Sequence, residues 1–250
     1  MAAVDNSAAA RPVLAAGKEI AVLFGAALEA VHVREDGGRT AAAEADAAGV
    51  PLRTIESESV AGGLIEEGRS PAVVALVMGA RGARTGRRPA GHVALELIVS
   101  TSKPVVVVPP TARAPWRLER ILVPLDATLA TTSALARTIE LARRAEIEVV
   151  ALHVHDERSL PPFTDQPQHE LEAWRHEFLA RYCPHGEGAR LDVRVGSPGE
   201  HVLDVAAAED VSLIALGWAQ DLGRGHAVVV QEVLGRSAVP VLLVPLAAAR

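Results

Sequence analysis

The sequence predicts an α/β fold built from two tandem copies of one unit. Apolar runs rich in β-branched residues alternate with helix-like segments along the chain, which is typical of a parallel sheet covered by helices. Short sequence matches recur in the same order in both halves, which indicates an internal duplication. The 250 residues are 49% apolar but only 3% aromatic, so Val, Leu, Ile and Ala must form the core, as in buried parallel strands.

Four matches between the halves support the duplication. The two later pairs are farther apart than the two earlier ones, so we expect an insertion between the second and fourth strands of the second half. The short segment 111–117 separates the halves, which predicts one domain over residues 1–112 and another over 117–250. The matched pairs are Asp5 with Asp126, His32 with His153, Gly79 with Gly217, and Pro104 with Pro240.

In the first half, short apolar runs predict strands, and the segments between them have helical patterns. The first strand starts almost at the beginning of the sequence, and a central strand this short would leave backbone groups of its neighbours unpaired. Either the short strand is tolerated, or a few residues precede it in the natural chain. The predicted strands are 2–5, 27–33, 52–56, 73–78 and 105–108, and the predicted helices are 8–24, 40–48, 60–67 and a segment from Gly91 to the Lys103-Pro104 pair.

The second half shows a more regular pattern. Leu135 and Ile139 lie on one face of an amphipathic helix. Ser197 followed by Pro198 is a favourable helix start, because serine caps the helix and proline suits its first position. The predicted strands are 120–125, 148–154, 190–195, 211–216 and 239–244, and the predicted helices are 132–145, 169–182 and 198–209, with a proline-rich loop at 159–168.

The stretch from Val73 to Pro109 has the features of an anion site. The strand 73–78 ends at Gly79, and Gly82 follows where the chain must turn. Glycines let backbone N–H groups approach a phosphate, and the N-terminus of the next helix adds partial positive charge. The alternative is a plain tight connection between strand and helix. The loop also carries four arginines and no acidic residue: Arg81, Arg84, Arg87 and Arg88.

This stretch resembles the signature of the universal stress protein family. In that family, two glycines three residues apart are followed, after nine residues, by a glycine and a serine or threonine. Gly79 and Gly82 match the first pair, and Gly91 follows after eight residues. His92 replaces the hydroxyl residue, and the spacing from Gly91 to Pro104 matches the family.

The resemblance implies a doubly wound five-stranded parallel sheet in each half, with strand order 3-2-1-4-5, an adenine nucleotide alpha hydrolase-like arrangement. Ligands bind such sheets where the strand order reverses, at the carboxyl ends of strands one and four. The implied ligand is ATP or a related adenine nucleotide, with Mg²⁺ accompanying it. The alternative for Asp5 is a turn residue that caps the next helix. The implied contacts are Asp5 and Val33 for adenine, Gly79, Gly82 and Gly91 for ribose and phosphates, and the backbone N–H groups of His92 and Val93 for phosphates.

The corresponding loop of the second half departs further from the family. Gly217 remains, but Gln220 stands where the second glycine would be. A side chain at this close approach keeps the backbone away from a phosphate. We therefore expect a structural copy without nucleotide, in which Gln220→Gly alters binding little. Trp218, Asp221 and Ala227 also depart from the pattern, whereas Asp126 and Val154 keep the residues of the family.

Composition excludes several classes of function. The net charge is −6 and no basic stripe is present, so we expect no nucleic-acid partner. The single cysteine, Cys183, excludes an internal disulfide and suits a reducing cytosol. No apolar run approaches the roughly 20 residues of a membrane helix, and the N-terminus lacks the regions of a signal peptide. These observations predict a cytoplasmic protein that does not enter membranes.

Other side chains give weaker signals. His169, Glu172 and His176 could share a helix face and hold a metal, but a solvated polar face is the stronger interpretation. His32 and His153 are interpreted as ordered structural histidines. Cys183 has no activating neighbour in the sequence and is interpreted as a buried thiol.

The sequence therefore predicts a tandem universal stress protein that binds nucleotide in its first domain and acts in stress response or signalling through contacts with a protein partner. No catalytic constellation is visible, so catalysis is not expected. The apolar fifth strands are expected to pair and join the halves as a pseudo-dimer, and a homodimer is left open. One alternative is a structural or interaction protein of the same fold without nucleotide; another is a relative of electron-transfer flavoproteins or adenylate-transferring enzymes.

Overall fold

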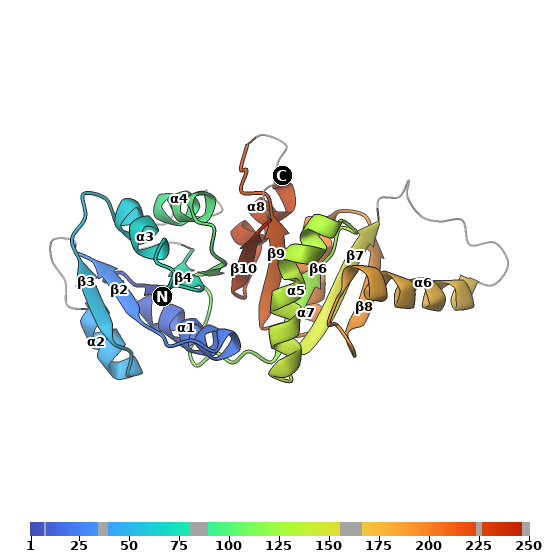
Figure 1. Ribbon diagram of the computed structural model, residues 1–250, viewed down its shortest axis with the longest axis horizontal. Coiled ribbons are helices and arrows are strands. Elements are labelled where there is room, and N and C mark those ends of the chain that lie inside the picture. Colours follow the sequence, from blue (N-terminus) through green and yellow to red (C-terminus); the bar gives the residue numbers. More distant parts are fainter. Residues whose placement is uncertain (8, 35–39, 81–89, 156–166, 224–226, 247–250) are drawn as a thin grey trace.

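The computed structural model describes residues 1–250 except 8, 35–39, 81–89, 156–166, 224–226 and 247–250. In the first half, short strands alternate with helices, as the apolar runs predict (Figure 1). The strands are β1 (Ala2–Ala3), β2 (Ala30–Val33), β3 (Leu52–Ile55), β4 (Leu76–Gly79) and β5 (Val105–Val108). The helices are α1 (Ala10–Phe24), α2 (Thr40–Ala48), α3 (Val60–Gly68) and α4 (His92–Ser100).

The second half repeats this succession. Its strands are β6 (Arg120–Pro124), β7 (Glu148–His155), β8 (Arg190–Val195), β9 (Leu213–Trp218) and β10 (Val241–Pro245). Its helices are α5 (Leu129–Arg144), α6 (Pro167–Tyr182), α7 (Pro198–Ala208) and α8 (Val228–Arg236). Helix α8 has no counterpart among the elements predicted for this half.

The strands of the described residues form one sheet in the order β3-β2-β1-β4-β5-β10-β9-β6-β7-β8. Each half thus has the predicted order 3-2-1-4-5, with parallel pairing throughout the half. The two sheets are not separate, because β5 pairs with β10 in antiparallel orientation. The α/β fold class is therefore confirmed, and the expected pairing of the fifth strands makes the two five-stranded sheets continuous.

The register of the β5–β10 junction keeps the two faces of the sheet consistent. Val106 lies opposite Leu242, and Val105 lies opposite Leu243. All four side chains are fully or almost fully buried. Because side chains alternate between the faces of a sheet, a shift of one residue would exchange the two faces. The register therefore lets one apolar layer run across both halves on each face.

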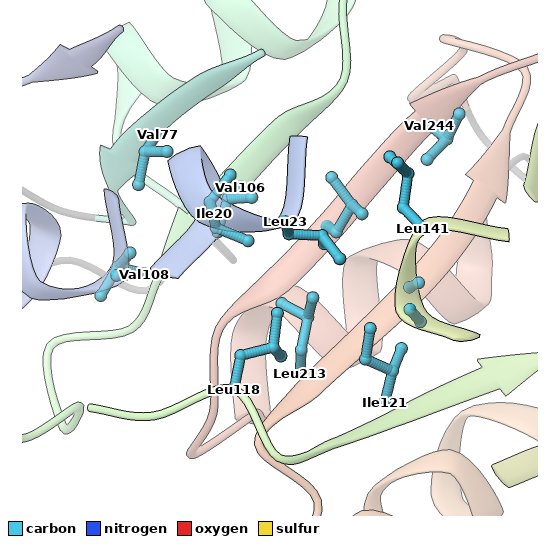
Figure 2. Close-up of a cluster of buried hydrophobic side chains, with 14 of the residues drawn as sticks. Ile20, Leu23, Val77, Val106, Val108, Leu118, Ile121, Leu141, Leu213 and Val244 are labelled. Atoms are coloured by element: carbon cyan, nitrogen blue, oxygen red, sulfur yellow. The ribbon is translucent and has the colours of Figure 1, made fainter. Parts of the chain in front are cut away.

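Helices cover both faces of the sheet, and each face has one core that spans the halves. One core lies under α1, α2, α5 and α6, and the other lies under α3, α4, α7 and α8. In the first core, Leu23 of α1 clusters with Leu141 of α5 and with Leu242 of β10. Figure 2 shows side chains of this cluster from both halves packed together. The halves are therefore held by helix packing as well as by strand pairing.

The central strand β1 is shorter than predicted. Ala2 and Ala3 pair with both β2 and β4, and the Met1 ammonium group donates to the carbonyl of Ala75 at 3.1 Å. A cavity of about 280 Å³ lies at this amino end of the sheet, between Met1 and Leu28. The short central strand thus leaves a small cavity at this end of the sheet.

The expected insertion lies between β7 and β8. Helix α6 has 16 residues, whereas its counterpart α2 has nine. Two aromatic side chains of α6, four residues apart, pack on His153 of β7. The ring centroids of Trp174 and Phe178 lie 6.0 and 4.6 Å from that of His153. His155 stacks edge-on with His153 at 4.4 Å, and burial followed by the charge of His153 lowers the pKa of His155. Aromatic contacts therefore attach this longer helix to the sheet.

Replacement of Leu23 by alanine is expected to destabilise the protein by about 2–5 kcal/mol, because it opens a cavity in the core shared by the halves. Leu23 is 4% exposed, whereas the adjacent Val22 is 77% exposed, so Val22→Ala is a matched control. The control is expected to change stability by no more than about 0.5 kcal/mol. Urea unfolding of both variants measures the difference, and equal losses would contradict the shared core.

Candidate functional site

A cavity of about 650 Å³ opens in the first half at the carboxyl ends of β1 and β4. After β1 the chain continues to β2 on one side, and after β4 it continues to β5 on the other side. A doubly wound sheet forms its crevice between two strands whose connections run in opposite directions. The seventh residue predicted for the site, Gly82, lies outside the described residues, as do the four arginines of the same loop. The cavity is lined by the other six: Asp5, Val33, Gly79, Gly91, His92 and Val93.

Asp5 organises the turn between β1 and α1. Its Oδ1 accepts hydrogen bonds from the N–H of Ser7 at 3.0 Å and from the Ser7 hydroxyl at 2.5 Å. The Ser7 hydroxyl in turn accepts from the N–H of Ala9, the N-cap residue of α1, which has no side-chain cap. Asp5 is thus a turn residue rather than a helix cap. Within the described part of the chain its Oδ2 accepts no hydrogen bond, so this atom can meet a ligand.

His32 is an ordered structural histidine, as predicted. It is 8% exposed and its Nδ1 lies 3.0 Å from the carbonyl of Val4. A carbonyl only accepts, so Nδ1 carries the proton and Nε2 accepts from the Asn6 amide at 3.3 Å. The Asn6 oxygen accepts from the N–H of Ala41 at the start of α2. In the second half, the Nδ1 of His153 makes the same contact as that of His32, at 2.7 Å from the carbonyl of Leu125.

Asn6 is a cavity residue that sequence reasoning did not identify. Its position after Asp5 was the available signal, because an amide at the end of a central strand reaches the crevice. Through His32 and Ala41 it fixes the wall of the cavity between β2 and α2. The counterpart in the second half is Ala127, which makes no such side-chain contact because it has no amide.

The N-terminus of α4 forms the opposite wall of the cavity. Gly91 is its N-cap and has no side chain, while the N–H of Gly91 donates to the carbonyl of Ala80 at 2.7 Å. The first N–H groups of a helix have no partner within the helix and carry partial positive charge. The first turn of α4 contains no acidic residue. This wall therefore suits an anion.

His92 contributes to this wall through its backbone. Its side chain is 80% exposed, and its Nε2 lies 3.4 Å from the Glu96 carboxylate one turn along the helix. The imidazole points to solvent and to Glu96, whereas the backbone belongs to the first turn of α4. The replacement of a hydroxyl residue by histidine at this position thus leaves the backbone of the helix start in place.

At the equivalent point of the second half, side chains lie close to the carboxyl end of β9. Asp126 repeats the turn of Asp5, accepting from the N–H of Thr128 at 3.0 Å and from its hydroxyl at 2.8 Å. A Cβ atom on Gly217 would meet Leu246 at 3.1 Å and Thr131 at 3.4 Å. The carboxyl end of β9 therefore lies against the side chains of Leu246 and Thr131.

Glu172, His176 and Cys183 do not line the cavity. His176 pairs with Glu172 at 3.5 Å, and the side chain of His169 lies outside the described residues. Among the residues that the structure describes, no group of three histidine, cysteine or acidic side chains can hold a metal ion. Cys183 is 4% exposed. The helices described here also include none that is long and apolar enough to cross a membrane.

The geometry agrees with comparisons to known proteins. The sequence model of the universal stress protein family matches residues 117–245. The chain belongs to the universal stress protein family. The match covers the second half of the chain. A search of curated proteins found no match to this universal stress protein.

Solved structures similar to this family member cover nearly the whole chain. A universal stress protein from Archaeoglobus fulgidus has a TM-score of 0.66 and 16% identity, over 97% of this chain and 96% of that one. One from Pseudomonas aeruginosa UCBPP-PA14, described as putative, has a TM-score of 0.65 and 16% identity, over 92% and 87%. At these identities the likeness shows the fold alone, and it covers both halves.

The thiol of Cys183 is expected to be unreactive in the folded protein. Burial, with a smaller effect of Glu187, raises the pKa of Cys183 from 9.0 to about 11. Only the thiolate reacts with alkylating reagents, so at pH 8 alkylation is expected to be slower by about 100-fold in the folded than in the urea-unfolded protein. The folded rate should rise as the pH approaches 11. Equal rates at pH 8 would contradict a buried thiol.

Proposed function

We propose that the cavity of the first half binds ATP or a related adenine nucleotide. The observation that carries the proposal is the convergence of Asp5, Gly79 and the start of α4 on one cavity of about 650 Å³. Small-molecule sites are typically clefts of about 300–1,000 Å³, so the space suits a nucleotide. The switch point of a doubly wound sheet is also where this class of ligand binds.

The two walls of the cavity suit the two ends of a nucleotide. Asp5 and Val33 would meet the adenine, where the Oδ2 of Asp5 can accept a hydrogen bond from the exocyclic amine. Gly79, Gly82 and Gly91 would line the ribose and phosphates. The backbone N–H groups of His92 and Val93 would meet the phosphates, because the helix start favours negative charge. Mg²⁺ would accompany the triphosphate on its phosphate oxygens.

Binding rather than catalysis is the proposed role. We assign no catalytic step to the site, and the protein would act in the cytoplasm in a stress response, through contacts with a protein partner that depend on nucleotide. We propose domains at residues 1–112 and 117–250, with nucleotide in the first and support from the second. A homodimer of this chain is a further possibility within the same proposal.

A second candidate function is a structural or interaction protein that binds no nucleotide. Two departures from the family pattern favour it: eight rather than nine residues between Gly82 and Gly91, and histidine at position 92. The side chains of Leu246 and Thr131 close to Gly217 support it too, because they leave less room for a ligand at the end of β9.

Binding of ATP separates the two candidates. At 100 times its dissociation constant, a ligand of the folded state stabilises the protein by about 2.7 kcal/mol. Thermal unfolding with ATP, with AMP and with buffer alone is therefore expected to show a higher midpoint with nucleotide. Unchanged midpoints at millimolar ATP would favour the protein without nucleotide.

Asp5→Ala is expected to weaken ATP binding by about tenfold, because the carboxylate oxygen that accepts from adenine is removed. Asp126→Ala is the matched control, since Asp126 forms the same turn in the other half. The control is expected to bind ATP like the parent. Titration calorimetry measures both, and equal losses in the two variants would contradict a site in the first half.

A further inference from the structure

Gln220 connects the two halves on the face of the sheet that carries α4 and α8. It lies between β9 and α8, where the repeat aligns it with Gly82 of the first half. Its amide Nε2 donates to the carbonyl of Thr101 at 2.6 Å. The same nitrogen lies 3.3 Å from the carbonyl of Ile98 and 3.4 Å from that of Val99. All three carbonyls belong to the C-terminal end of α4.

This contact satisfies atoms that α4 leaves without a partner. The last carbonyls of a helix have no N–H donor within the helix, and they carry partial negative charge. The last turn of α4 contains no basic residue. Carbonyls only accept, and the Gln220 amide nitrogen has two N–H donors, so it can serve Thr101 and one of the other two at a time. Gln220 is therefore a C-cap of α4 supplied by the other half.

The backbone at Gln220 has a conformation that is unfavourable for glutamine. Its φ is 59°, in the left-handed region that is unfavourable for a residue with a Cβ atom. Glycine, which the family pattern has at this position, adopts that region freely. A glutamine here is strained unless its side chain offsets the cost, and the contact with α4 does so.

Helix α4 links this contact to the cavity. Its C-terminal end is capped by Gln220, and its N-terminal end, at Gly91, His92 and Val93, lines the site. A helix of nine residues is a rigid rod about 13 Å long, so fixing one end restricts the other. The second half can therefore act on a site that lies wholly in the first.

We propose that Gln220 is a positioning residue for the phosphate end of the nucleotide site. This role rests on the proposed function, in which the start of α4 binds the phosphates. Loss of the amide frees the C-terminal end of α4 and disturbs its N–H groups at the phosphates, while the adenine contacts on β1 and β2 remain. The sequence alone predicts that Gln220→Gly changes nucleotide binding little. Because Gln220 contacts α4, we instead expect this variant to bind the phosphates more weakly.

The test compares ATP with adenosine in the full-length chain. Gln220→Ala and Gln220→Gly both remove the amide, and the glycine variant also relieves the left-handed backbone, which protects it against unfolding. ATP affinity is expected to fall by about tenfold in both, and adenosine affinity to stay within about twofold of the parent. Gln231→Ala is the control, because the Gln231 amide donates to Leu222 within its own half. Its affinities should match the parent.

Hydrogen exchange of the ligand-free protein gives a second readout. Amides in the last turn of α4 should exchange about fivefold faster in both Gln220 variants. Unchanged ATP affinity, or an equal loss of ATP and adenosine, would overturn the positioning role. If the parent protein binds neither ligand, the proposed function fails. Hydrogen exchange then tests only whether Gln220 stabilises the end of α4: faster exchange in the variants supports this, and unchanged exchange overturns it.

Discussion

The antiparallel pairing of β5 with β10 is the interaction on which the rest of the structure depends. Each half ends in an apolar strand at the edge of its sheet, and an unpaired edge of this kind exposes backbone donors and acceptors. Pairing satisfies these groups and buries both strands. It also sets α1 beside α5 on one face and brings the β9–α8 loop to α4 on the other.

The duplicated unit has kept its framework and changed its loops. Asp5 and Asp126 form the same turn, and His32 and His153 each bond to the carbonyl of the first residue after the neighbouring strand. These side chains hold the carboxyl ends of the strands, so both copies retain them. In the second copy, Gln220 of the loop after β9 contacts the end of α4 in the other half.

Helix α4 is where the fold and the site meet. Its middle residues Ala94, Leu97 and Ile98 are buried in the core on its face of the sheet. Its first residues line the cavity, and its last carbonyls accept from the other half. One short helix thus combines core packing, a cavity wall and a contact between the halves.

The sequence by itself determined the strands, because apolar runs and repeats are local patterns. The resemblance to the universal stress protein family implied the strand order in each half. That order in turn implied the convergence of Asp5, Gly79 and Gly91, because the carboxyl ends of adjacent parallel strands must meet. Helix α8 was missed, and the roles of Asn6, Leu246 and Gln220 were decided only by the tertiary structure. Each of these roles is a contact between segments far apart in the chain. Residue type and spacing record what a segment does locally, whereas such contacts depend on the packing of the whole sheet.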